Sequence, residues 1–174
     1  MDFGSKNEQV SFLSAHGYSY ILDSEQMPGK TTLWYHFETE THTSSALILA
    51  KYLADFGNEK ATTLVTLDNM YLWPSGRDEY LIKTAFKSIT GAKVVQPEDG
   101  TMFVWHRSEM KEAITLYHMA MLFGWDAYIY PKDAKVSAFI SHDGFIEINT
   151  DADPLALATN IKEKTGRKFT LIDQ

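Results

Sequence analysis

The sequence predicts an α+β protein with a mainly antiparallel sheet, built from about four strand–strand–helix units with the helices packed on one face of the sheet. Three observations support this prediction. Short alternating segments come in pairs that are separated by turn-forming residues, which indicates hairpins and antiparallel pairing. A segment with helical periodicity follows each pair. Four of the helical segments are followed by a glycine suited to a left-handed cap: Gly57, Gly91, Gly124 and Gly166.

The predicted strands are rich in β-branched and aromatic residues and stop at turn-forming residues. The strongest hairpin signal is Asp143-Gly144. The expected strands cover residues 18–23, 31–38, 62–67, 70–73, 92–96, 101–107, 126–131, 135–141, 145–149 and 168–172. The chain has 174 residues, so we expect a single α+β domain over residues 1–174.

The predicted helices cover residues 6–16, 44–56, 76–90, 109–123 and 154–165. The helix at 44–56 is apolar almost all round, so we expect it to be the most buried helix. The helix at 154–165 has Asp153 in the capping position and Pro154 at its first helical position, and both are favourable there.

The charge balance bears on the class of partner. The formal net charge is −7, and such a chain is repelled by phosphate backbones, so we expect no nucleic-acid partner. The largest basic cluster is Lys162, Lys164, Arg167 and Lys168. We interpret it as a solvated helix end, where cations stabilise the helix dipole. The alternative is a site for a phosphate or an acidic partner.

The sequence also favours a cytoplasmic location. Cysteine is absent, which excludes disulfides and a thiol nucleophile. The first ten residues lack the basic and apolar regions of a secretory signal. The most apolar window, 113–131, is interrupted by His118, Gly124 and Asp126, so we expect no membrane span and no membrane partner.

The stretch "HFETETH" raises the question of a metal or acid–base site. His36 and Glu38 share one phase of a strand, but His36 and His42 would lie about 20 Å apart on an extended chain, and zinc needs its ligands at roughly 2.0–2.2 Å. The stretch is therefore at best half a site. The candidate catalytic residues are His36, Glu38, His106 and His142. The alternative is the polar outer face of a strand, and we predict no metal and no cofactor.

Two other motifs do not predict catalysis. "SHDG" at 141–144 places serine, histidine and aspartate side by side, but neighbours in a tight turn diverge, so they do not form a hydrolase triad. "PGKTT" at 28–32 lacks the first glycine of a phosphate-binding loop and continues into a strand instead of a helix.

Aromatic side chains gather on the strand phase opposite the expected core. The candidate binding residues are Trp34, Tyr128, Tyr130, Phe139 and Phe145. Aromatic residues mixed with polar ones are typical of recognition surfaces. The competing interpretation is that a second layer covers this face and makes it core.

These observations favour a non-catalytic, cytoplasmic, protein-binding module of the inhibitor, immunity or regulatory type. It would recognise a protein partner, or a second copy of itself as a homo-oligomer, through an aromatic and acidic surface. The alternative is a small-ligand-binding protein or hydrolytic enzyme in which His36 and Glu38 act with other histidines as metal or acid–base groups.

Overall fold

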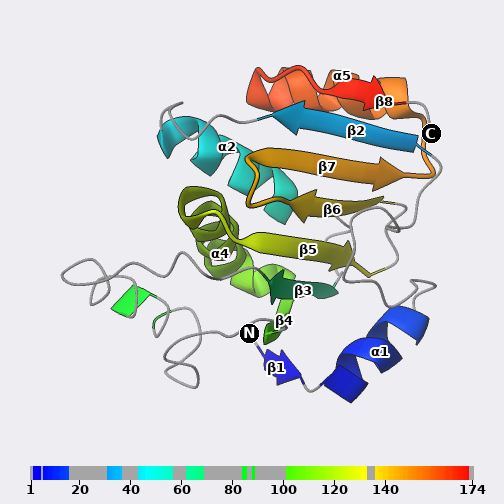
Figure 1. Ribbon diagram of the computed structural model, residues 1–174. Helices are drawn as coiled ribbons and strands as arrows, with labels where there is room; N and C mark the ends of the chain where they lie inside the picture. Colours follow the sequence, from blue (N-terminus) through cyan, green and yellow to red (C-terminus); the bar gives the residue numbers. More distant parts are fainter. Residues whose placement is uncertain are drawn as a thin grey trace.

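The computed structural model describes residues 2–4, 6–15, 31–36, 43–56, 62–68, 84–85, 88, 101–132 and 136–172. Figure 1 shows one broad sheet with helices against it. The strands are β1 (Asp2–Gly4), β2 (Thr31–His36), β3 (Thr62–Asp68), β4 (Thr101–His106), β5 (Asp126–Pro131), β6 (Val136–Ile140), β7 (Phe145–Thr150) and β8 (Thr170–Ile172). The helices are α1 (Lys6–Ala15), α2 (Thr43–Ala54), α4 (Met110–Phe123) and α5 (Pro154–Thr165), with a 3-10 turn η2 (Arg107–Glu109) before α4.

Within the residues that the structure describes, the strands form one eight-stranded sheet in the order β1-β4-β3-β5-β6-β7-β2-β8. Every neighbouring pair is antiparallel. Among these described strands, β1 and β8 form the two edges. β2 is inserted between β7 and β8 although it precedes them by more than a hundred residues in the chain.

The predicted α+β class and the antiparallel sheet are confirmed, while the four strand–strand–helix units are an approximation. β5, β6 and β7 follow one another before α5. The predicted strands 18–23, 70–73 and 92–96 and most of the helix 76–90 lie outside the described residues. β1 was not predicted, because three residues are too few to display a period.

The helix ends and the β6–β7 hairpin are defined by interactions between residues close in the sequence. The Asp153 carboxylate accepts hydrogen bonds from the backbone N–H groups of Leu155 and Ala156, as expected of an N-cap. Gly124 and Gly166 end α4 and α5 with positive φ angles of 61° and 70°. The β6–β7 hairpin closes at Gly144, where φ is 82°.

The larger core lies between one face of the sheet and the helices α2, α4 and α5. α2 supplies Leu49 and Leu53 to it, and the sheet supplies Leu33, Ile140 and Ile146, all of them buried. These three strand residues lie on the strand phase opposite the one that carries Trp34, Phe139 and Phe145. The helix at 44–56 is deeply buried, as predicted.

A smaller core lies on the opposite face of the sheet. Leu13 of α1 packs there in one cluster with Leu64, Tyr128, Tyr130 and Phe139. The predicted packing of the helices on one face thus describes α2, α4 and α5, while α1 contributes to the other face. No helix in the described part of the chain combines the length and the apolar character needed to cross a membrane.

Candidate binding surface

The predicted aromatic residues all lie on the sheet face opposite α2, α4 and α5. Residues that face each other across neighbouring antiparallel strands point to the same side. Trp34 of β2 faces Glu147 of β7, Glu147 also faces Phe139 of β6, and Phe139 faces Tyr128 of β5. Phe145 lies beside this line, opposite His36. The alternation of apolar and polar residues in four separate strands therefore builds one continuous surface.

The rings on this surface touch one another in a row. The ring centroids of Tyr128 and Phe139 are 4.6 Å apart and stacked, and those of Phe139 and Phe145 are 5.8 Å apart in an edge-to-face arrangement. Phe145 and Trp34 follow at 5.1 Å, and Trp34 and His36 at 6.0 Å. Such contacts add stability beyond the burial of area. We call Tyr128, Phe139, Phe145 and Trp34 the aromatic row.

The aromatic row is buried at one end and open at the other. Tyr128 and Phe139 are buried in the smaller core, together with Tyr130. Phe145 and Trp34 are half-buried, and His36 beyond them is exposed. Tyr128 and Phe139 thus fit the interpretation of this face as core, whereas Trp34 and Phe145 fit its interpretation as a surface. Trp34 and Phe145 are partly open to solvent, whereas the remaining predicted binding residues lie buried beside them on the same face.

A short polar chain runs beside the open end. The Thr32 hydroxyl donates to the side-chain oxygen of Asn149 at 2.7 Å, and the Asn149 amide donates to Glu147 Oε1 at 3.0 Å. Burial raises the pKa of the Glu147 carboxyl, and the hydrogen bond from Asn149 partly offsets this effect. The arrangement holds a half-buried acid in a fixed position between Trp34 and Phe139.

The structure places two of the predicted catalytic residues, His36 and His106, far apart. His36 lies at the end of β2 and His106 at the end of β4, five positions apart in the sheet order, or about 24 Å. The strand registers also place His36 and His106 at opposite ends of the sheet along the direction of the strands. Glu38 lies outside the described residues. Within the described ranges no group of three histidine or acidic side chains is arranged to hold a metal ion.

His142 is a turn residue, as "SHDG" suggested. Its backbone N–H and its Nδ1 both contact Oδ1 of the buried Asp126, at 2.7 Å and 3.0 Å. The Ser141 hydroxyl accepts a hydrogen bond from the Asp143 backbone at 3.1 Å. These polar groups stabilise the turn and do not form a nucleophile with its base. His106 is the N-cap of η2, and its backbone N–H donates to Glu109 Oε2 at 3.0 Å. Its ring nitrogen lies 3.2 Å from the Thr62 hydroxyl on the paired strand β3.

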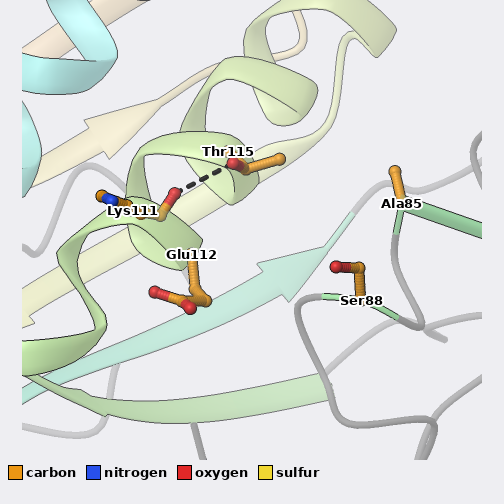
Figure 2. A pocket seen from close by; sticks show the side chains of 5 residues that line it. All are labelled: Ala85, Ser88, Lys111, Glu112 and Thr115. Carbon is orange, nitrogen blue, oxygen red and sulfur yellow. Dashed lines mark hydrogen bonds between the residues drawn. The ribbon is translucent and has the colours of Figure 1, made fainter.

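A shallow hollow of about 270 Å³ beside α4 is lined by mixed polar groups (Figure 2). The Thr115 hydroxyl donates to the backbone carbonyl of Lys111 at 2.9 Å, within the helix itself. Glu112 of α4 and Ser88 both line the hollow. An acid, an amine and two hydroxyls on an open surface do not form a water-excluding site for catalysis.

Comparison with protein-family models, with curated proteins and with solved structures gave no match. The surface is therefore interpreted from its own chemistry. Glu147 was not among the binding residues predicted from the sequence. Its signal is the shared phase of Phe145, Glu147 and Asn149 in "FIEIN", which places two polar side chains next to an aromatic one on the same side of β7.

Proposed function

We propose that this protein is a non-catalytic module that binds a protein partner through the open end of the aromatic row. The observation that carries the proposal is the contact between Trp34 and Phe145, whose rings lie 5.1 Å apart and stay half-exposed. Phe145 rests against the buried Phe139, and Trp34 packs against Phe145 in turn. Large, preorganised aromatic side chains are typical anchors of interfaces.

The charges favour a partner with a basic surface. Glu147 adds an acidic group next to Trp34, and the whole chain carries a formal charge of −7. An arginine or lysine of the partner would be attracted by both, and it would also gain from stacking on the Trp34 ring. As part of this proposal we expect an inhibitor, immunity or regulatory role in the cytoplasm, where a protein without cysteine needs no oxidising environment.

The proposal is tested by truncating the anchor. The immobilised wild-type protein is used to isolate partners, and their affinities are then measured by calorimetry for purified variants. We expect Trp34→Ala to weaken binding by about 2 kcal/mol, or roughly 30-fold, as loss of a central tryptophan does. Leu122→Ala is the control, because Leu122 is 43% exposed but lies on α4, away from the row. Equal affinities for wild type and Trp34→Ala would overturn the proposal.

Trp34→Ala and Phe139→Ala should lower the free energy of unfolding by different amounts. Phe139 is buried, so Phe139→Ala should lower the free energy of unfolding by about 3–5 kcal/mol. Trp34 is half-exposed, so Trp34→Ala should cost clearly less. Urea denaturation of the two variants measures both values. A larger loss for Trp34→Ala would mean that Trp34 is a core residue instead of an anchor.

A further inference from the structure

A second surface lies at the β8 edge of the sheet, next to α5 (Figure 1). A hollow of about 250 Å³ separates the two elements. α5 lines it with Leu155, Thr159 and Lys162, which recur at the spacing of one helix face. β8 lines it with Leu171. We call this hollow the α5–β8 groove.

The groove is apolar and open. Leu155 is 67% exposed and Leu171 is 37% exposed, and Ile172 on the other side of β8 is 42% exposed. Leu33 and Phe169 form its buried floor. In the described part of the chain β8 pairs with β2 alone, so its outer edge presents backbone groups that can accept a further strand. Exposed apolar side chains next to an open edge suit an extended peptide.

The structure divides the basic cluster of the sequence into two pairs. Lys164 lies 3.6 Å from the Asp55 carboxylate, and Arg167 donates a hydrogen bond to the Ser45 hydroxyl, so both contact α2 or the residue that follows it. Lys162 and Lys168 instead line the groove. Neither of them pairs with a carboxylate among the residues that the structure describes. Two cations thus remain at an apolar groove of an otherwise acidic protein.

We propose that the α5–β8 groove binds an extended acidic peptide segment of another protein by strand addition to β8. An apolar side chain of the segment would fill the space between Leu155 and Leu171, and its carboxylates would pair with Lys162 and Lys168. β8 has only three residues, so it offers few backbone hydrogen bonds. The side-chain contacts in the groove would therefore decide which segment binds. This surface is separate from the aromatic row and attracts the opposite charge.

The experiment selects peptides of about twelve random residues displayed on phage against the wild-type protein. We expect the enriched peptides to combine acidic and apolar residues. Fluorescence polarisation with one labelled peptide then compares variants. The double variant Lys162→Glu/Lys168→Glu and the variant Leu155→Ala should each bind about tenfold more weakly or worse. Because these residues are exposed, their melting temperatures should match that of the wild type.

Matched variants serve as controls. Lys51→Glu/Lys111→Glu changes the net charge equally on exposed positions of α2 and α4, and Leu122→Ala removes an exposed leucine elsewhere. Both should bind the peptide like the wild type. Trp34→Ala should also bind it normally, and this result would distinguish the groove from the surface of the proposed function. Enrichment of basic peptides, no enrichment, or equal binding by the groove variants would overturn the proposal. Dimerisation that Leu155→Ala abolishes would also overturn it, because a second copy would then occupy the groove.

Discussion

At the scale of single residues, the buried carboxylate of Asp126 organises the β6–β7 turn. Its Oδ1 accepts from both the backbone and the ring of His142, and a buried carboxylate requires such partners. The hydrogen bond to Asp126 raises the pKa of the His142 ring, the charges of Asp126 and Asp143 raise it further, and partial burial opposes them. The contact links the start of β5 to the end of β6.

This contact predicts a pH-dependent contribution to stability. A histidine whose pKa is raised on folding stabilises the protein fully at pH values below its ordinary pKa, and the contribution is lost as the pH rises through the raised pKa. We therefore expect His142→Asn to lower the free energy of unfolding more at about pH 5.5 than at about pH 8.5. Urea denaturation at both pH values measures the difference, and the titration of Glu147 cancels because both proteins share it.

Asp126→Asn provides the control for this prediction. It keeps an oxygen that can accept the His142 backbone N–H but removes the negative charge. In that background His142→Asn should have an effect that varies much less with pH. An equal loss at both pH values in the wild-type background would mean that the charged histidine does not contribute to folding.

At the scale of elements, α2 joins the core to the neighbouring helices. Leu49 and Leu53 pack into the larger core, and Tyr52 donates a hydrogen bond to the Asn160 side chain of α5 at 3.1 Å. Burial, assisted by the nearby Asp55, raises the pKa of Tyr52 to about 12, so this hydroxyl stays a donor at neutral pH. Just after the helix, Asp55 lies 2.6 Å from Arg107 of η2. α2 and the residue that follows it therefore contact both α5 and η2.

Two substitutions within α2 should have opposite outcomes. Leu53 is 1% exposed and Ile48 is 40% exposed. Leu53→Asp would bury an unpaired charge, which costs several kcal/mol and is comparable to the whole stability of a typical domain, about 5–15 kcal/mol. Ile48→Asp keeps its charge in water and should remain folded. Circular dichroism with thermal melting distinguishes them, and a cooperatively melting Leu53→Asp variant would contradict the core position of α2.

At the scale of the whole molecule, one sheet separates two apolar layers of unequal size. The helices α2, α4 and α5 cover one face, and the cluster around Leu13 and Tyr128 lies on the other. The two edges carry the strands nearest to the chain termini, β1 and β8. Apolar burial on both faces of the sheet stabilises the fold.

This architecture predicts that folding requires no metal. Addition of a strong chelator such as EDTA should leave the melting temperature unchanged, because no bound ion contributes linkage energy to the folded state. Differential scanning calorimetry with and without the chelator measures this. A marked decrease in the melting temperature would support a metal site that involves His36 and Glu38.

Features that depend on neighbours in the chain could be predicted from the sequence. Asp153, Gly124 and Gly166 mark helix ends, because capping involves groups within a few residues of each other. Alternation assigned Trp34, Phe139 and Phe145 to one face, because the side-chain direction reverses at each residue of a strand. The class of the fold follows from the order of these local elements.

Features that depend on contacts between distant residues could not be predicted in this way. The hydrogen bond from Thr32 to Asn149 joins residues 117 positions apart, and no local pattern specifies that β2 pairs with both β7 and β8. That pairing leaves β8 at the edge and Lys162 and Lys168 in the groove. Leu13 likewise packs against Tyr128 and Phe139 while Trp34 stays half-exposed. The order of the strands and the choice of which residues cover each sheet face follow from burying all apolar faces at once. This burial depends on contacts along the whole chain.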